Sequence, residues 1–565
     1  MNGENSRIIT SNDYEDLILD EFQLQRMRLI NPDIYSKRIN NQYSAAYFPR
    51  ESAESNILYE YGLDAIPKCF GLMTYYSTES INSGLNNSNP NAHFKGQGVL
   101  LGFVDTGIDY RNKAFRNIDG TTRILSIWDQ GIEGESIQSS EVDYGTIYDR
   151  DQINAALKTA DPLELVPSID EIGHGTALAG AAGGSLDETY DFSGVASAAE
   201  FIIVKLKPAK PYIKEFFFLA EDTICYQEND IMFGINYLVE TARNLKRPIV
   251  ICIGMGTSQG SHSGDGIFNN FLSAMGRYGD VSIVVAAGNE GNRNHHYYGE
   301  LNPAVGYNEV DINISEGEIG VFMEFWGNSP NIFYADIYAP TGELVGRVPT
   351  VYRQTSTEIM QYRETTIYID STIDNFQIGD QFILLRIRSP ISGVWRLLVY
   401  GVGNLHSSFH IWLPIYNFIL EGTQFLNPNQ YTTITNPGNE ETVLTVTAYN
   451  DKTMELYYYA SRGFTKDNHP KPDITAAGVE LPAPVYIDSF IYITGTGAAA
   501  AYTAGSVAIL MEWGIVRGNL ASLPSAKIRS MVVSGATRSS EIEYPNPDWG
   551  FGILNINNSI RISRT

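Results

Sequence analysis

Four short motifs in this chain of 565 residues place reactive residue types beside apolar runs. Asp105 ends an apolar run, His174 stands in Gly-His-Gly-Thr at an expected helix start, and Asn289 follows another apolar run. Gly497 lies in Gly-Thr-Gly-Ala-Ala, a tight turn leading into an expected helix of small residues. An Asp–His pair can hold and move a proton, and an Asn amide can donate a hydrogen bond to a developing oxyanion.

Each motif also has a simpler structural interpretation when it is taken alone. An Asp at a strand end is most often a turn-former, and an Asn there is most often a turn residue. A single His at a helix start is more often a packed or capping residue than a base. The significance of each residue therefore depends on the company of the others.

The elements that must position these residues alternate between strand and helix. Apolar runs at residues 98–104, 202–206, 248–253 and 281–287 predict strands that are covered on both faces. Apolar residues recur at helical spacing between 230 and 245. This alternation predicts an α/β core with a parallel sheet, and ligands bind at the carboxyl edge of such a sheet.

The pattern changes along the chain and predicts four parts: residues 1–93, 94–304, 305–430 and 431–565. The first part contains a strand-like run at 43–48, an expected helix at 54–62 and an Asn/Ser/Gly-rich linker at 83–90. The third has short alternating runs, such as 310–314, 320–326, 365–369 and 395–400, with no convincing helix. It is predicted to be an all-β insert between two parts of the α/β core.

Composition excludes several classes of protein. The net charge is −26, so nucleic acid and anionic membrane surfaces are unfavourable partners. With 43% hydrophobic and 18% charged residues, the chain can bury enough apolar surface to fold. Its three cysteines are too few for a disulfide framework and have no metal-ligand spacing. We find no signal peptide and no apolar run that predicts a membrane span, so synthesis in the cytoplasm is expected.

The four motifs occur in the chain order Asp, His, Asn, Gly-Thr-x-x-Ala-Ala, which resembles the subtilisin-like serine proteases. The resemblance extends from about residue 96 to the C-terminus and implies a subtilisin-like parallel sheet flanked by helices. It also implies a small α+β N-terminal prodomain, and the all-β insert would be jelly-roll-like. Within that family the chain is similar to the Csp proteins of clostridial spores, through its short leading part, its insert, and endings such as 435–439 and 548–554.

The resemblance assigns roles to individual positions. Asp105, His174 and position 497 correspond to the catalytic triad, and Asn289 corresponds to the oxyanion-hole residue. The predicted substrate cleft comprises Gly254, Met255, Gly256, Ala286, Ala287 and Gly288. Glu290 would lie near the base of the pocket for the first substrate side chain, which would suit a polar or basic residue. No metal and no cofactor is predicted.

The family's nucleophilic serine is replaced by Gly497, which has no side chain that can attack a carbonyl. Thr496 is adjacent, but its hydroxyl is expected to point elsewhere, and Ser506 lies about two and a half helical turns away. Oxyanion stabilisation alone gives roughly 10³ to 10⁴ over water, too little for peptide cleavage on a cellular timescale. The sequence therefore predicts a foldable chain with a silent site.

The resemblance implies two alternative functions. The first is an inactive pseudoprotease that regulates spore germination and binds other Csp proteases or a cortex-hydrolase precursor, with a small-molecule germinant as a further candidate. The second is an active germination protease that processes a cortex-hydrolase zymogen. In this alternative the catalytic serine of the protease was replaced by engineering. Departures from the family at Gly254 and Ala477 favour natural loss of the serine. Retention of Asp105, His174 and Asn289 favours the second alternative. In either case we expect residues 1 to about 80 to stay covalently attached, with their C-terminal stretch in the substrate cleft. The expected location of the protein is the bacterial spore.

Overall fold

The structure is a computed structural model that describes residues 2–50, 61–80, 93–133, 142–301, 304–349, 356–373, 379–402, 406–487 and 489–564. The helix expected at 54–62 lies almost entirely outside these residues, and the linker at 83–90 lies wholly outside them.

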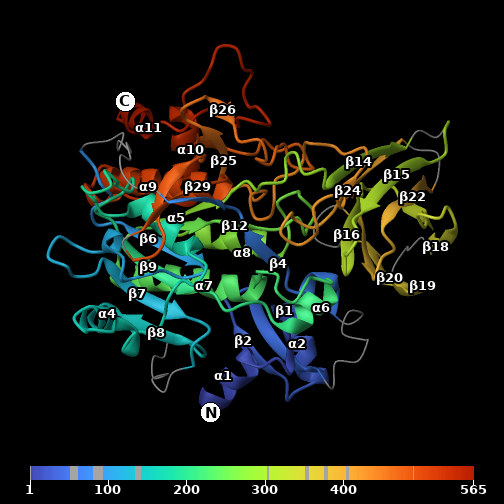
Figure 1. Ribbon diagram of the computed structural model, residues 1–565, viewed down its shortest axis with the longest axis horizontal. Helices are drawn as coiled ribbons and strands as arrows, with labels where there is room; N and C mark the ends of the chain where they lie inside the picture. The colour runs from blue at the N-terminus through green and yellow to red at the C-terminus, as the bar shows by residue number, and fades with distance from the viewer. Residues whose placement is uncertain are drawn as a thin grey trace.

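The centre of the molecule is a nine-stranded sheet that is mainly parallel (Figure 1). Its order is β26-β25-β13-β11-β6-β9-β7-β8, with β27 also paired to β25. The strands are β6 Leu100–Asp105, β7 Ile124–Asp129, β8 Thr146–Asp149, β9 Glu200–Lys205, β11 Ile249–Ile253, β13 Val281–Ala286, β25 Leu444–Asn450, β26 Glu455–Leu456 and β27 Ile474–Ala477. The four strands predicted from apolar runs are β6, β9, β11 and β13, and they are adjacent to one another in this sheet. The expected α/β core with a parallel sheet is confirmed.

Helices cover both faces of this sheet, which explains why its strands are apolar on both sides. The helices of the α/β part are α4 Arg150–Ala156, α5 His174–Gly183, α6 Pro211–Phe216, α7 Glu228–Leu245, α8 Ile267–Gly276, α9 Thr496–Met511, α10 Ser525–Gly535 and α11 Ile556–Ile562. Leu101 and Cys252 face α5 and α9, whereas Leu100 and Ile251 face α7 and α8. The single-turn helices are η2 Leu63–Ala65, η3 Lys113–Phe115 and η4 Pro162–Glu164, and the π-turn η5 Glu512–Val516 continues α9.

Helix α9 with its π-turn, Thr496–Val516, is apolar and long enough to cross a membrane by length and composition. However, 83% of its most apolar window is buried inside the protein. It contacts β25, β13 and β11 as well as α5. We therefore assign it as the core helix of the α/β part.

The leading residues form a small sheet below the α7 face of the core (Figure 1). Its order is β1-β3-β2. The elements are α1 Asn2–Thr10, β1 Tyr14–Asp20, α2 Glu21–Ile30, β2 Tyr35–Arg38 and β3 Tyr43–Pro49, followed by β4 Cys69–Leu72 and β5 Tyr75–Ser80. The run predicted at 43–48 is β3. Helix α2 was not predicted because Phe22 and Leu29 are exposed, so its apolar residues do not follow one face.

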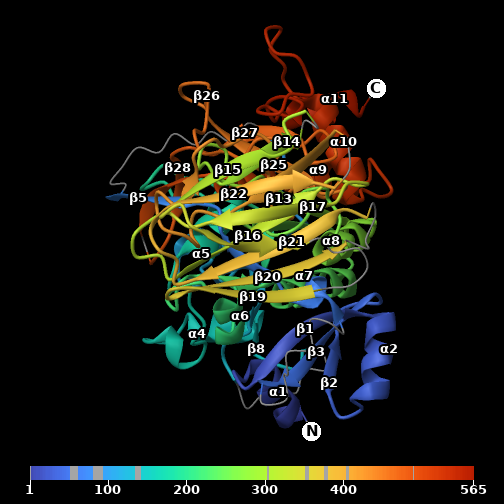
Figure 2. The ribbon, with the colours of Figure 1, turned by 90° about the vertical axis from the view of Figure 1, so that its right-hand side faces the viewer.

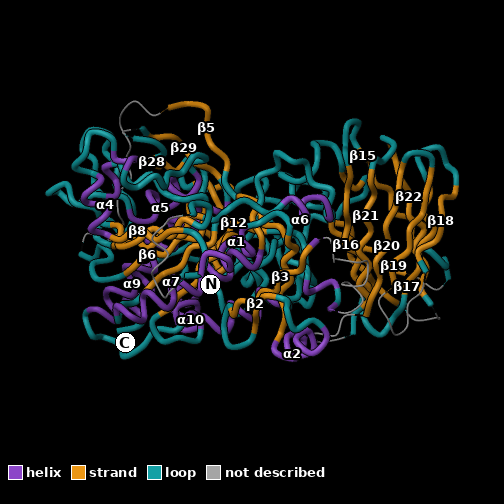
Figure 3. The backbone as a smooth tube through the Cα atoms, turned by 90° about the horizontal axis from the view of Figure 1, so that it is seen from below, coloured by secondary structure: helices purple, strands orange, loops and turns teal. Residues whose placement is uncertain are grey.

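Two antiparallel sheets stand beside the core and enclose an apolar core of their own (Figures 2 and 3). The first has order β14-β23-β16-β21-β20-β19, and the second has order β18-β17-β22-β15-β24. The strands are β14 His296–Leu301, β15 Asn308–Ile314, β16 Gly320–Gly327, β17 Phe333–Tyr338, β18 Leu344–Val348, β19 Ser356–Tyr362, β20 Thr365–Ile373, β21 Gln381–Arg388, β22 Gly393–Gly401, β23 Ser407–Trp412 and β24 Gln424–Phe425. The described residues of this insert contain no helix. Its first strand begins at His296, ahead of the predicted boundary at 305, because β14 pairs along its whole length with β23.

Two short sheets connect the leading residues to the core. Strand β4 lies between β10 Tyr226–Gln227 and β12 Met255–Gly256. Strand β5 pairs with β29 Phe490–Thr494, which in turn pairs with β28 Leu481–Pro484. Residues 69–80 therefore add two strands to the core, β4 and β5. Met73 and Thr74 lie between these two strands.

Candidate active site

The structure brings Asp105 and His174 together in the protein interior. Asp105 ends β6 and His174 begins α5, and both side chains are fully buried. Nδ1 of His174 lies 2.7 Å from Oδ1 of Asp105, which also accepts a hydrogen bond from the Thr106 amide. Nε2 of His174 is buried without a hydrogen-bond partner. The imidazole is thus oriented by the carboxylate on one side and leaves its other nitrogen available.

Close packing of small residues makes this approach possible. A Cβ added at Gly175 would lie 2.2 Å from the carbonyl oxygen of Gly107, so only glycine lets α5 approach the turn after β6. Gly173, the residue before the helix, has a φ of 88°, a conformation that favours glycine. The Asp170 carboxylate accepts hydrogen bonds from the amides of Gly173 and Thr176 and so fixes the helix start.

Gly497 lies in the first turn of α9 and faces the backbone of Met73. Its amide donates a 2.9 Å hydrogen bond to the carbonyl oxygen of Met73. The Asn289 side chain accepts hydrogen bonds of 3.1 Å from the amide and hydroxyl of Thr496, at the same helix start. The side-chain nitrogen of Asn289, Nδ2, is buried without a hydrogen-bond partner. A backbone donor and a side-chain amide are thus gathered at the start of α9, as oxyanion stabilisation requires.

The predicted cleft residues Gly254, Met255 and Gly256 lie along the segment 69–74. Met255 pairs with Leu72, Gly256 pairs with Gly71, and the Met73 amide donates a 3.0 Å hydrogen bond to the Gly254 carbonyl. A Cβ at Gly254 would lie 3.2 Å from Cε1 of His174, so this backbone connects the imidazole to the bound segment. It would also lie 2.3 Å from Cδ1 of Leu178, whose side chain takes up the space that a larger residue here would need.

Ala286, Ala287 and Gly288 lie at the end of β13. Thr435 lies between these residues and Gly256. The Thr435 amide donates a 2.9 Å hydrogen bond to the Ala287 carbonyl. A Cβ at Gly256 or at Gly288 would lie 2.5 Å from the Thr435 hydroxyl oxygen. The wall between the two predicted cleft strands therefore includes Thr435, which the sequence motifs did not indicate.

The structure does not support the expectation that Glu290 suits a polar or basic substrate residue. One of its carboxylate oxygens lies 2.6 Å from Nδ1 of His295, and the other accepts a 3.0 Å hydrogen bond from the Tyr416 amide. Both oxygens are engaged by the protein. The Met73 side chain, fully buried, instead reaches toward Gly256, where a Cβ would lie 3.1 Å from its Cε.

Neither Thr496 nor Ser506, the two hydroxyls considered from the sequence, is available as a substitute nucleophile. The Thr496 hydroxyl accepts a hydrogen bond from the Gly288 amide and donates to Asn289. The Ser506 hydroxyl donates to the Tyr502 carbonyl of its own helix. A third hydroxyl, that of Thr74, lies only 2.4 Å from where a Cβ at Gly497 would be, and it is buried without a partner. The side chain of Thr74 therefore fills the place of a side chain at position 497.

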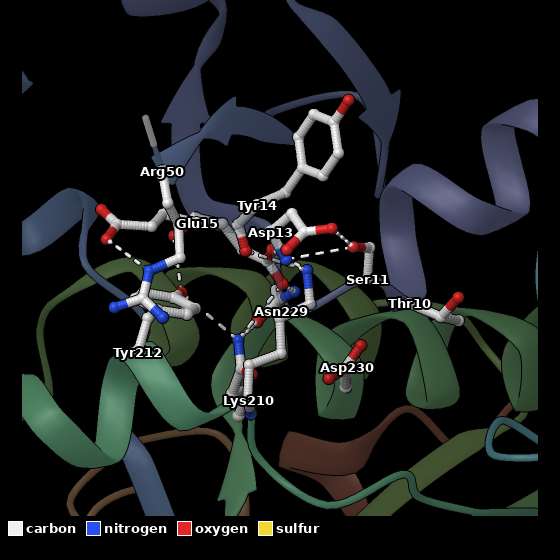
Figure 4. Close-up of polar contacts among 12 residues, drawn as sticks. Thr10, Ser11, Asp13, Tyr14, Glu15, Arg50, Lys210, Tyr212, Asn229 and Asp230 are labelled. Atoms are coloured by element: carbon white, nitrogen blue, oxygen red, sulfur yellow. Dashed lines mark hydrogen bonds and ion pairs between the residues drawn. The ribbon is translucent and has the colours of Figure 1, made fainter. Parts of the chain in front are cut away.

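The leading sheet is held against the core by a buried ionic contact. Nζ of Lys210 lies 2.6 Å from Oδ1 of Asp16, and both side chains are almost fully buried. Gln227 and Asn229 each donate a 3.2 Å hydrogen bond to the other oxygen of Asp16. Figure 4 shows Lys210 and Asn229 reaching toward the strand that carries Tyr14 and Glu15. Burial lowers the pKa of Lys210, while the Asp16 charge opposes that shift.

Sequence motifs did not reveal the residues on the far side of Met73. Arg293 and Tyr416 contact Tyr75 there, and Tyr459 packs against the Arg293 guanidinium. All three come from loops with no recurring spacing. Among the described residues, no group of three or more His, Cys, Asp or Glu side chains is arranged to hold a metal ion.

A parallel sheet with an Asp–His pair and a helix start facing a bound backbone carbonyl defines a subtilisin-type site. The family model of the subtilase family matches residues 96–360 and 388–552, and the chain belongs to this family. The gap between these matches falls within the β insert.

The comparison with solved structures includes a bacterial protease that is similar over most of its length. The CspB protease of Clostridium perfringens is 30% identical with a TM-score of 0.75, over 84% of this chain and 95% of that chain. A subtilisin-like protease of Arabidopsis thaliana, SBT3.5, is 33% identical over 124 residues. That match covers 20% of this chain and 16% of the plant protein.

Proposed function

We propose that this chain is a non-catalytic subtilase that regulates bacterial spore germination by binding a protein partner. The observation that carries the proposal is Gly497, whose amide contacts the Met73 carbonyl where the family has a nucleophilic serine. Without a hydroxyl, the oriented imidazole of His174 has no nucleophile to deprotonate. The site retains binding and oxyanion geometry but lacks the bond-forming atom.

The fit of Thr74 against Gly497 supports natural loss of the serine. A Cβ at position 497 would lie 2.4 Å from the Thr74 hydroxyl oxygen and 2.9 Å from the Met73 carbonyl oxygen. The bound segment and the glycine are thus complementary in shape. Leu178 fills the space beside Gly254 in the same way.

The leading residues would act as a prodomain that stays covalently attached and fills the cleft. The pairing of β4 with β12 and the buried Asp16–Lys210 contact support this role. Release of the leading residues from the cleft would require both the β4–β12 pairing and the Asp16–Lys210 contact to break. The partner would be another Csp protease or a cortex-hydrolase precursor, with a small-molecule germinant as a further candidate, and the setting would be the spore. The similarity to the CspB protease supports this assignment.

The alternative is a germination protease whose serine was replaced. The preserved 2.7 Å contact between His174 and Asp105 favours it, because a purely binding protein has no need of that pair. The two functions differ in their dependence on His174.

Complementation of a deletion in the parent bacterium separates them. Spores carrying the native gene or its His174→Ala variant should germinate equally if the protein acts by binding. Germination lost in the His174→Ala spores, with the variant present at normal abundance, would support the protease. The genomic codon for position 497 shows directly whether glycine is native.

A further inference from the structure

The cleft continues beyond Met73 into a cluster formed by Arg293, Tyr416 and Tyr459, which we call the aromatic clamp. Arg293 lies between β13 and β14, Tyr416 follows β23, and Tyr459 follows β26. The guanidinium carbon of Arg293 lies 3.6 Å from the ring centroid of Tyr459 and 4.8 Å from that of Tyr416. The insert and the core therefore build this cluster together.

The aromatic clamp holds Tyr75, the second residue after Met73. The rings of Tyr75 and Tyr416 are stacked, with centroids 4.9 Å apart and an interplanar angle of 29°. The Arg293 guanidinium lies 5.7 Å from the Tyr75 ring centroid and also donates a hydrogen bond to the Tyr75 hydroxyl. Aromatic stacking and cation–π contact are both sensitive to geometry, so this site distinguishes an aromatic residue from an aliphatic one.

The loop that carries Tyr416 also holds the backbone on the other side of Met73. The Leu72 carbonyl accepts hydrogen bonds from the Tyr416 hydroxyl, at 3.2 Å, and from the Asn417 side chain, at 3.0 Å. One loop thus contacts the segment on both sides of the residue that faces Gly497.

Contacts within the protein fix this loop in place. The Tyr416 amide donates to the Glu290 carboxylate, which is held by His295. Glu290 directly follows Asn289, so the aromatic clamp is connected to the oxyanion donor through adjacent residues. A pre-organised site of this kind loses little conformational freedom on binding.

We infer that the aromatic clamp makes this cleft selective for an extended partner segment with an aromatic residue two places after a buried, unbranched apolar residue. The inference rests on the proposed binding function. The chain's own sequence Leu72-Met-Thr-Tyr75 is the occupant in the structure, and a partner segment would replace it. Such a partner segment would bind as a strand between β10 and β12, the place that β4 occupies in the structure. Its aromatic ring would pack against Tyr416 and Arg293.

The test uses the full chain with its own segment weakened by the double substitution Met73→Gly and Tyr75→Ala. A labelled peptide with the sequence of residues 67–80, carrying Ser in place of Cys69, is titrated by fluorescence anisotropy. A second peptide has Ala at the position of Tyr75. We expect the Tyr peptide to bind about tenfold more tightly or better, and a Phe peptide to retain most of that preference.

Variants of the aromatic clamp show whether the preference arises there. Arg293→Gln and Tyr416→Ala should reduce the Tyr-to-Ala preference to about twofold or less. Arg347→Gln is the matched control, because Arg347 lies 5.1 Å from the ring centroid of Tyr334 on the insert, outside the clamp. It should leave the preference unchanged. Equal binding of the Tyr and Ala peptides, or no binding of either, would overturn the inference.

A measurement on the chain's own segment covers the case in which the weakened variant fails to fold. Amide hydrogen exchange at residues 73–76 should rise about tenfold in Arg293→Gln and stay unchanged in Arg347→Gln. Unchanged exchange in Arg293→Gln would also overturn the inference. Neither result bears on catalysis, so a failure of this inference is distinguishable from a failure of the non-catalytic function, which the His174 experiment tests separately.

Discussion

The amide of Gly497 donates a 2.9 Å hydrogen bond to the carbonyl oxygen of Met73. A backbone carbonyl of the chain itself thus accepts a hydrogen bond from one of the two groups that correspond to oxyanion donors, while the side-chain nitrogen of Asn289 has no partner. Under the proposed function, Met73 and Thr74 remain joined there because no side chain at position 497 can attack that carbonyl.

Restoring a serine should restore self-cleavage. The Gly497→Ser variant is expected to cut slowly between Met73 and Thr74, since the Asp105–His174 pair is already in place. Thr74 must rotate away from the new Cβ, so adding Thr74→Ala should speed the cut about tenfold, as a lower barrier of about 1.4 kcal/mol would do. Intact mass over time measures both.

The control for this experiment is Gly497→Ser combined with His174→Ala, which should be slower by roughly 10³-fold or more. A cut at a different bond would show that Met73 is not the residue presented to position 497.

The contact between Asp16 and Lys210 should be essential for docking of the leading sheet. Asp16→Ala leaves a buried ammonium without its partner, which typically costs about 3–5 kcal/mol. Urea unfolding measures the loss. The exposed pair Arg50–Glu215 is the matched control, and Arg50→Ala should cost less than about 1 kcal/mol. Equal losses in the two variants would mean that burial of the Asp16 contact is not maintained in solution.

Acidification should destabilise the insert through His296 and His410. Nε2 of His296 lies 2.9 Å from Nδ1 of His410, and the two rings are stacked. Burial lowers the pKa of His296 to about 3 and that of His410 well below its usual value, with the charges of His296, Lys466 and His262 adding to the shift at His410. The unfolded chain therefore binds protons below about pH 6.5 that the folded chain does not.

The free energy of unfolding should fall with pH below about 6.5, with each histidine contributing a slope of up to about 1.4 kcal/mol per pH unit. Urea titrations between pH 7 and pH 5 measure this slope. The double variant His296→Gln and His410→Gln should flatten it, whereas exchange of the exposed His406 for Gln should not. A slope that is the same in all three proteins would contradict the assignment.

The approach of α5 to β6 should depend on Gly175. In Gly175→Ala the new Cβ would meet the Gly107 carbonyl oxygen at 2.2 Å, which we expect to cost about 1–3 kcal/mol and to lengthen the Asp105–His174 contact. Unfolding measures the cost, and the downfield proton resonance of the His174 ring reports the contact. Gly276→Ala, whose Cβ would lie 3.1 Å from the Ser525 side chain, should cost less. A Gly175→Ala protein with unchanged stability and resonance would show that the helix start has room to move.

The sequence predicted the parts of the site that recur as motifs on regular elements. Asp105, His174, Asn289 and Gly497 each follow an apolar strand or begin a helix of small residues, so motif order was enough to place them. The aromatic clamp was not predictable, because Arg293 and Tyr416 lie in loops whose proximity depends on how the insert packs.

Other differences also have physical causes. Helix α2 carries exposed apolar residues and shows no helical periodicity, although Asp20 and Gln23 form its capping box. The start of the insert at β14 depends on pairing with β23, which is far away in sequence. Occupation of the cleft was expected for the end of the leading part, but the register that presents Met73 to Gly497 comes from the β4–β12 pairing.

The most direct test of a silent site is the intact mass and probe reactivity of the unmodified protein. We predict that the purified chain keeps its full 565-residue mass during long incubation and gains no adduct from a fluorophosphonate probe. Loss of residues 1–73, or a covalent adduct within α9, would show that a nucleophile operates in this cleft and would contradict the proposed function.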